Sequence, residues 1–145
     1  KVSPLIDELT ETIYTVSNDG SIYAINLNGE MLWKRHIGED LNTIPLIFDN
    51  NLLINSDIGV IFCLNKRNGD IKWFHELKNK ALDIKIISNK LVIGCAQGYL
   101  LFLNINNGKI IQCQKLSNQN IIKIDTYQNK LLITFEDGRS YLIET

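Results

Sequence analysis

The sequence predicts an all-β fold, a β-propeller of four-stranded antiparallel blades, from two observations. A glycine-centred phrase recurs along the chain, with its marker glycines at Gly20, Gly59, Gly98 and Gly138, separated by 39, 39 and 40 residues. Each period also contains four short apolar or alternating runs bounded by glycine, asparagine, aspartate or charged residues. Four strands in each such period match the length of a propeller blade, and about 3.75 blades are expected in this chain.

The recurring phrase joins a tight turn to an apolar strand. It reads Asn-Asp-Gly-Ser-Ile-Tyr-Ala-Ile-Asn in residues 18–26 and returns, with changes, in residues 57–65, 96–104 and 136–143. A hairpin turn needs a residue with positive φ at a fixed place, and glycine supplies it without steric penalty. The runs of the second period, at residues 45–48, 52–55, 60–64 and 71–75, are therefore predicted to be strands.

The repeat defines the blades in order. The first is expected at about residues 2–36, the second at 44–76, the third at 82–116 and the fourth at 121–144. Two segments read alone could be helical, namely residues 5–16 and the four-residue spacing of Trp73, Leu77 and Ala81. The repeat overrules both, because their copies elsewhere are strand-like, and helix content should be negligible.

The fourth blade supplies only three strands, and this shortfall predicts an open ring. Closed propellers leave no free edge, and an N-terminal strand can complete the last blade. The chain also starts with Lys1 rather than methionine. We therefore expect the C-terminal part of a ring of seven or eight blades, which needs its N-terminal half or a second copy to close.

Composition excludes several classes of protein. The 145 residues are 45% hydrophobic, with 15 basic and 16 acidic side chains and a net charge of −1. These values are those of a globular domain, and they give no electrostatic basis for binding nucleic acid. No uninterrupted apolar stretch reaches the roughly 18 residues that a membrane-spanning helix needs.

The three cysteines predict neither disulfides nor a metal site. Cys63, Cys95 and Cys113 are odd in number and have no CxxC spacing. We expect all three to be small buried hydrophobic residues, reduced and slow to react with thiol reagents.

A second glycine and a tryptophan complete the repeat and point to a family. The second glycine stands at Gly29, Gly69 and Gly108, and the tryptophan follows as Trp33 and Trp73. This pattern resembles the quinoprotein-type (PQQ-like) propeller repeat, and it lacks the Gly-His and Trp-Asp dipeptides of the tryptophan–aspartate repeat. The last third is similar to the BamB family of outer-membrane assembly lipoproteins. The residues that support the narrower resemblance are Leu91, Val92, Ile93, Gly94, Gly98, Tyr99, Leu100, Asn104, Gly108, Lys109, Lys130, Leu131, Leu132, Ile133, Asp137, Gly138 and Tyr141.

The resemblance implies a non-enzymatic scaffold. It would lie in the periplasm, associated with the outer membrane, and help to assemble and insert β-barrel proteins with the β-barrel assembly machinery as its partner. Two alternatives stay open: the C-terminal part of a PQQ-dependent dehydrogenase, and a sensor or signalling propeller of the same repeat class. Quinone enzymes of this superfamily place calcium, a catalytic aspartate and often adjacent cysteines beside the cofactor. No such cluster stands out here, so no cofactor is expected.

The individual candidate residues favour structural roles. In the repeat family the tryptophan docks one blade against the next, so Trp33 and Trp73 are expected to pack between blades, whereas Gln112 should leave its seam looser or differently filled. His36 and His75 are expected to be polar residues near the ends of outer strands. The acid pairs Glu39-Asp40 and Glu136-Asp137 fit turns better than general acid–base catalysis. The sequence therefore gives no catalytic, cofactor-binding or metal-binding residue, and it leaves the partner-binding residues unspecified.

Overall fold

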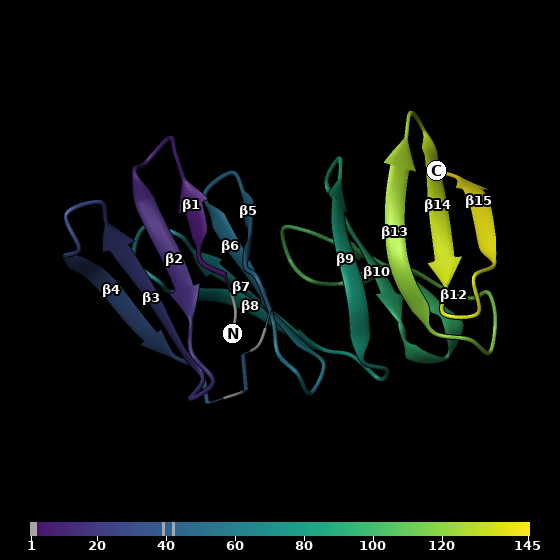
Figure 1. The fold of residues 1–145 in the computed structure, drawn as a ribbon, viewed down its shortest axis with the longest axis horizontal. Coiled ribbons are helices and arrows are strands. Elements are labelled where there is room, and N and C mark those ends of the chain that lie inside the picture. Colours follow the sequence, from purple (N-terminus) through teal and green to yellow (C-terminus); the bar gives the residue numbers. More distant parts are fainter. Residues whose placement is uncertain (1–2, 39, 42) are drawn as a thin grey trace. The chain divides into compact units, whose positions relative to one another are not determined.

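The computed structural model describes residues 3–38, 40–41 and 43–145, and in these residues the fold is all-β (Figure 1). The strands form four antiparallel sheets in which neighbours in sequence are neighbours in space. One 3-10 turn, η1 (Ala96–Gly98), is the only helical element in these ranges. The predicted fold class is confirmed, and each of the two segments with helical spacing forms parts of two strands and the connection between them. Within the described residues no helix is long and apolar enough to cross a membrane.

The first two sheets have four strands each, in the order of the chain. The first sheet consists of β1 (Leu5–Asp7), β2 (Thr12–Val16), β3 (Ser21–Asn26) and β4 (Met31–His36). The second consists of β5 (Leu46–Phe48), β6 (Asn51–Asn55), β7 (Val60–Asn65) and β8 (Ile71–Glu76). The four strands predicted for the second period agree with these bounds to within a residue.

The third sheet has four strands and the fourth has three. The third consists of β9 (Ala81–Ile87), β10 (Lys90–Cys95), β11 (Tyr99–Asn104) and β12 (Ile110–Lys115). The fourth consists of β13 (Ile121–Tyr127), β14 (Lys130–Phe135) and β15 (Ser140–Glu144). In each of the other sheets the third strand pairs with a fourth strand on its outer side. In the fourth sheet β15 is the third strand, and in the described residues it pairs only with β14, so it is an edge strand.

The same turn residues recur from sheet to sheet along the chain, and their chemistry explains why these hairpins form. The marker glycines all have positive φ, between 72° and 93°. The asparagine that ends β3 caps the next turn, because the Oδ1 of Asn26 accepts hydrogen bonds from the backbone N–H groups of Asn28 and Glu30. Asn65 and Asn104 cap their turns with the same atom. Asparagine therefore recurs at this place because its side chain satisfies backbone donors that the ladder leaves free.

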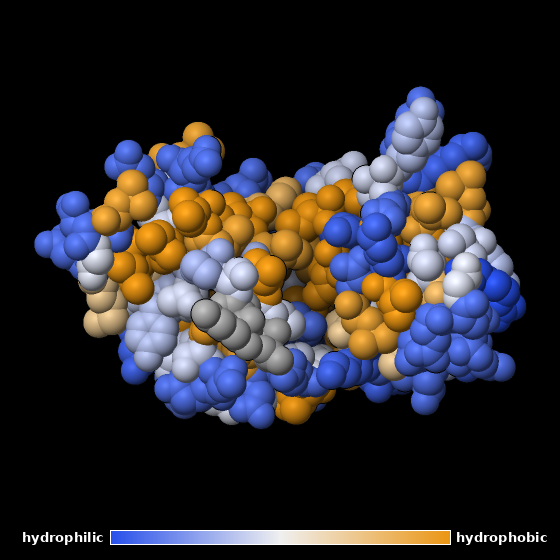
Figure 2. All heavy atoms as spheres, viewed as in Figure 1, coloured by the Kyte–Doolittle hydropathy of each residue, from blue (hydrophilic) through white to orange (hydrophobic). Residues whose placement is uncertain are grey.

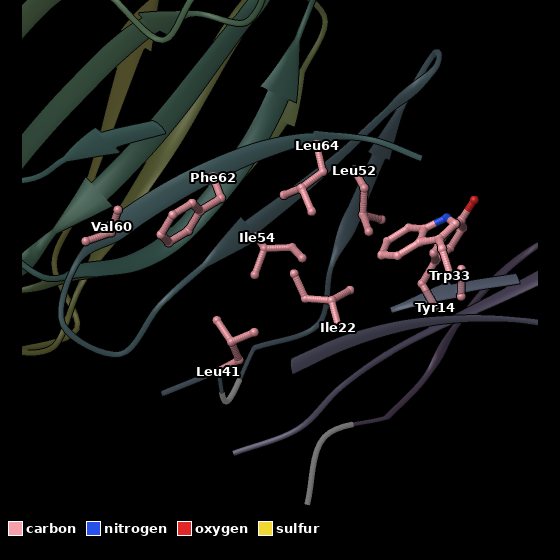
Figure 3. Packing of buried hydrophobic residues seen from close by; sticks show 10 residues of the cluster. Tyr14, Ile22, Trp33, Leu41, Leu52, Ile54, Val60, Phe62 and Leu64 are labelled. Atoms are coloured by element: carbon pink, nitrogen blue, oxygen red, sulfur yellow. The ribbon is translucent and has the colours of Figure 1, made fainter. Parts of the chain in front are cut away.

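The chain divides into two compact units, residues 1–76 and 77–145, with two sheets in each. A buried apolar cluster packs the first unit and includes Ile22, Leu52 and Ile54 (Figure 3). A second cluster packs the second unit and includes Val92, Ile124 and Phe135. Apolar residues also reach the surface of both units among hydrophilic ones (Figure 2).

Candidate functional site

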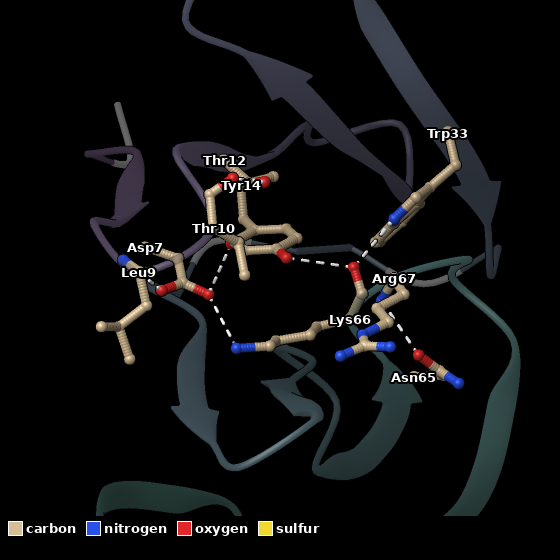
Figure 4. Close-up of polar contacts among 9 residues, drawn as sticks. All are labelled: Asp7, Leu9, Thr10, Thr12, Tyr14, Trp33, Asn65, Lys66 and Arg67. Atoms are coloured by element: carbon tan, nitrogen blue, oxygen red, sulfur yellow. Dashed lines mark hydrogen bonds and ion pairs between the residues drawn. The ribbon is translucent and has the colours of Figure 1, made fainter.

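Trp33 lies in the seam between the first and second sheets. Its side chain is 9% exposed, and its Nε1–H donates a hydrogen bond of 3.0 Å to the backbone oxygen of Lys66 (Figure 4). The hydroxyl of Tyr14 donates to the same oxygen, also at 3.0 Å, and the two rings are 6.1 Å apart. The predicted packing role of Trp33 is confirmed, because Trp33 on β4 of the first sheet contacts the β7–β8 turn of the second.

Gly69 allows the ring of Trp33 to lie against the β7–β8 turn. A Cβ at this position would lie 2.6 Å from the Trp33 ring, and the φ of +77° is one that only glycine adopts easily. Arg35, two residues after the tryptophan, donates from Nε to the backbone oxygen of Gly69 at 2.7 Å. Its Nη2 pairs with Asp70 at 2.8 Å. The second glycine of the repeat therefore allows its own turn to form and also leaves room for the tryptophan of the neighbouring sheet.

A buried ion pair joins the same two sheets. Nζ of Lys66 lies 2.8 Å from Oδ2 of Asp7, and the two side chains are only 8% and 6% exposed. Asp7 also accepts hydrogen bonds from the Thr10 hydroxyl at 2.8 Å and the Leu9 N–H at 3.2 Å. The hydrogen bond from Lys66 holds the pKa of Asp7 below its usual value, although burial acts to raise it. Both charges are thus satisfied inside the seam.

Sequence reasoning missed this pair. Two signals pointed to it: an aspartate stands at position 7, where the matching strand of the second sheet has Phe48, and the turn that contains Lys66 is one residue longer than its counterpart before Gly29. Neither signal names the partner, because Asp7 and Lys66 are 59 residues apart and meet only through the fold.

The seam between the third and fourth sheets is filled differently. The repeat positions of Tyr14, Ala24 and Trp33 are occupied here by Val92, Phe102 and Gln112. Gln112 is exposed, and beside it lies a pocket of about 420 Å³ lined by residues of both sheets. The expectation that Gln112 would leave this seam differently filled agrees with the pocket.

The remaining aromatic and histidine candidates lie in outer strands. Trp73 is half-buried in β8, so its packing between blades stays a prediction. His36 ends β4 and is exposed, with Nδ1 3.2 Å from the Ser21 hydroxyl. His75 lies in β8 and is partly buried. The positions of both histidines near the ends of outer strands are as predicted.

The cysteines correct one expectation. Cys63 and Cys95 are buried in β7 and β10, and burial raises the pKa of their thiols to about 11 and about 12. Cys113 is exposed in β12, so the prediction that all three thiols are buried is wrong. The physical reason is that β12 is the outer strand of its sheet, where few residues are covered.

The acidic pairs take part in turns where the structure describes them. Oδ1 of Asp137 accepts from the backbone N–H of Arg139, and Oε2 of Glu136 accepts from the Asn120 side chain. The backbone oxygen of Asp40 accepts from the N–H of Asp57. Glu39 and the predicted first residue of the first blade, Val2, lie outside the described residues. Over residues 3–38, 40–41 and 43–145, no three His, Cys, Asp or Glu side chains are placed to hold a metal ion.

Comparison with known proteins identifies the family. The family described as "Outer membrane protein assembly factor BamB" matches residues 10–128. The chain belongs to this family. The resemblance of the repeat to the quinoprotein-type repeat and that of the last third to the BamB family are both confirmed.

Curated relatives agree with the BamB assignment. The chain is 28% identical to BamB of Salmonella typhimurium over 135 residues and 26% identical to BamB of Escherichia coli over 141 residues. In both cases 90% of this chain is matched to 34% of the relative, so the chain spans about a third of these relatives' length.

Solved structures share the fold. BamB from Moraxella catarrhalis matches with a TM-score of 0.82 and 15% identity, covering 99% of this chain and 49% of that one. The C-terminal WD40 domain of Sif2 matches with a TM-score of 0.78 and 13% identity, covering 92% and 40%. The second match shows that the propeller architecture does not depend on the Trp-Asp signature, which this chain lacks.

Proposed function

We propose that this chain is part of a non-enzymatic scaffold that assists the assembly and insertion of β-barrel proteins into the bacterial outer membrane. The observation that supports this proposal is the BamB family match over residues 10–128. The scaffold would act in the periplasm as an outer-membrane lipoprotein, with the β-barrel assembly machinery as its partner. The chain would form one part of a propeller of seven or eight blades.

The geometry suits a scaffold. The seam around Trp33 and Lys66 fixes two sheets against each other through buried apolar, ionic and hydrogen-bonded contacts, so the outer strands have a rigid base. Those outer strands, β4 and β8, expose large apolar side chains, among them Leu32 and Phe74 at 53% and 60%. Exposed apolar groups on a rigid surface favour protein contacts.

The quinoprotein dehydrogenase alternative gains no support from the described residues, which offer no metal-ligating cluster. Calorimetric titration with pyrroloquinoline quinone and calcium separates the two functions. We expect no saturable heat, whereas saturable micromolar binding would favour the dehydrogenase.

A chimera tests the scaffold function. This chain replaces the matching third of Escherichia coli BamB, in a strain that lacks its own BamB. We expect the chimera to restore the amount of folded β-barrel protein in the outer membrane, measured by the faster gel migration of unheated barrels.

Two control strains give the upper and lower limits of the measurement. One carries intact Escherichia coli BamB, and the other carries BamB that lacks the matching third. A stable chimera that restores no more folded barrel than the shortened protein would contradict the proposal.

A further inference from the structure

The β7–β8 turn contains Asn68-Gly69, a dipeptide whose own atoms can react with each other. The backbone nitrogen of the glycine loses its proton to a base in the solvent and attacks the side-chain carbonyl carbon of the asparagine. The side-chain nitrogen takes up a proton and leaves as ammonia, and water then opens the cyclic succinimide to aspartate or isoaspartate. Glycine favours ring closure because it has no side chain in the way, and asparagine is among the thermolabile residues.

The seam between the first and second sheets holds the attacking nitrogen in place. Asn68 is exposed, whereas Gly69 is buried beside the ring of Trp33. The N–H of Gly69 donates to the backbone oxygen of Asn65 at 2.8 Å. The carbonyl of Gly69 accepts a hydrogen bond of 2.7 Å from Nε of Arg35. Trp33 and Arg35 of the first sheet therefore fix the residue whose nitrogen would have to move.

The side chain that would be attacked is held as well. Oδ1 of Asn68 accepts a hydrogen bond of 3.0 Å from the N–H of Asp70. Asp70 in turn pairs with Nη2 of Arg35 at 2.8 Å. The reaction requires the Asn68 side chain to leave Asp70 and the nitrogen of Gly69 to leave its acceptor. Both movements need the turn to separate from the first sheet.

The first sheet contains the same dipeptide, Asn28-Gly29, with a different set of hydrogen bonds. Here Oδ1 of Asn26 accepts from the N–H of Glu30, which is the counterpart of Asp70. In the part of the chain that the structure describes, the side chain of Asn28 therefore makes no hydrogen bond. This difference arises within the turn itself, so Asn28 serves as an internal reference for an asparagine whose side chain is not held.

We propose that Asn68 is a latent self-modification site, which the seam protects and which converts to isoaspartate when the seam opens. Isoaspartate lengthens the main chain by one methylene group and adds a negative charge beside Asp70. The longer main chain would displace Gly69 from the ring of Trp33, so the opened seam would not close again in the same geometry. A transient local opening would thereby become a permanent covalent change.

The rates of modification in the full 145-residue chain test the protection. The chain is incubated in mildly alkaline buffer, and the peptides that contain Asn28 or Asn68 are followed by mass spectrometry. Isoaspartate is detected with an enzyme that methylates its carboxylate. We expect Asn28 to be modified at least about tenfold faster than Asn68 in the wild type. Equal rates would overturn the proposal.

The variant Arg35→Gln loosens the seam without touching the dipeptide. It removes the hydrogen bond to the Gly69 carbonyl and the pair with Asp70. Modification of Asn68 should become about tenfold faster, because bonds of this kind to charged groups are of that strength. The rate at Asn28 in the same molecules should not change.

The matched control is Ile61→Val, which trims a buried side chain of the second sheet outside the apolar cluster of the first unit. It should leave the rate at Asn68 close to that of the wild type. Urea unfolding gives the stability of each variant. If the rate at Asn68 follows overall stability and not the loss of Arg35, the seam does not protect this site and the proposal is wrong.

A second experiment tests whether the change is permanent. The wild type is incubated in the urea concentration of its unfolding midpoint, returned to native buffer and unfolded again. The control is Asn68→Ser, whose hydroxyl can still accept from the N–H of Asp70 but cannot form a succinimide. We expect the wild type to lose stability with incubation time and Asn68→Ser to keep it, since both chains are modified alike at Asn28. Equal losses would show that isoaspartate at Asn68 does not disturb the seam, and would overturn the permanent change.

Discussion

At the scale of single residues, Trp33 joins two sheets through both its ring and its N–H group. Trp33→Ala should lower the free energy of unfolding by about 3–5 kcal/mol, because it removes the buried ring. Trp33→Phe should cost less, since it keeps an aromatic ring but leaves the Lys66 carbonyl with the Tyr14 hydroxyl alone. Urea unfolding measures both variants. Met31→Ala, on the same strand and 61% exposed, should change stability by less than about 0.5 kcal/mol.

The Asp7–Lys66 pair should make the first unit sensitive to acid. Because the pKa of Asp7 is lowered in the folded state, the unfolded chain takes up this proton at a higher pH, and acid favours unfolding. The stabilising contribution is complete above the ordinary carboxyl pKa of about 4 and is lost as pH falls through the lowered value.

Urea unfolding at several pH values tests this dependence. Asp7→Asn should be less stable at neutral pH by about 3–5 kcal/mol, since Lys66 keeps a buried charge without its partner. The free energy of unfolding of Asp7→Asn should also fall less steeply than that of the wild type below pH 4. Asp70→Asn, which breaks the exposed pair with Arg35, should cost less than about 1 kcal/mol. An unchanged slope in Asp7→Asn would show that other groups cause the acid sensitivity.

The three thiols should differ in reactivity. Cys113 is exposed and should react with a thiol reagent within the mixing time of a native labelling experiment. Cys63 and Cys95 should react far more slowly, because burial blocks access and raises the pKa of each thiol. Mass spectrometry of the native protein should therefore find one rapid modification, located at Cys113. Rapid labelling of Cys95 would contradict the burial of β10.

At the scale of elements, the third and fourth sheets approach closely at Gly94 of β10. A Cβ on Gly94 would collide with the Cγ2 methyl of Ile121 on β13, and Gly94 does not need a positive φ. Gly94→Ala should therefore destabilise the second unit by about 1–3 kcal/mol through steric overlap alone. In the double variant Gly94→Ala, Ile121→Ala, the loss in urea unfolding should be smaller than the sum of the single losses. Additive losses would show that the glycine is needed for another reason.

The sheets and their turns were predictable from the sequence because they depend on local rules. Glycine and asparagine at fixed places set the turns, and the apolar runs between them set the strands. The role of Trp33 was predictable from the repeat as well. The Asp7–Lys66 pair was not, because it depends on which strands face each other across a seam. The exposure of Cys113 was also missed, since an outer strand exposes residues that an alternating pattern would bury.

At the scale of the whole molecule, the edge strand β15 should drive self-association of this 145-residue chain when the chain is produced by itself. In the first three sheets the strand that follows the marker glycine pairs on both sides, whereas β15 pairs only with β14 in the described residues. Its free backbone groups, flanked by Tyr141 and Leu142 at 40% and 60% exposure, favour pairing with another strand. A second copy of the chain offers such a strand. We expect a dimer, which would bring together about eight blades, close to the seven or eight expected of a complete ring.

Sedimentation equilibrium over a range of protein concentrations measures this association. Leu142→Lys should shift the equilibrium toward monomer, because a lysine on an edge strand disfavours pairing with another edge. Ile110→Lys makes the same change of charge at an exposed position of β12 and should leave the dimer unchanged. If both lysine variants weaken association equally, net charge rather than the β15 edge is responsible. If the wild type stays a monomer that melts cooperatively, the edge of β15 is sealed within the single chain and needs no second strand.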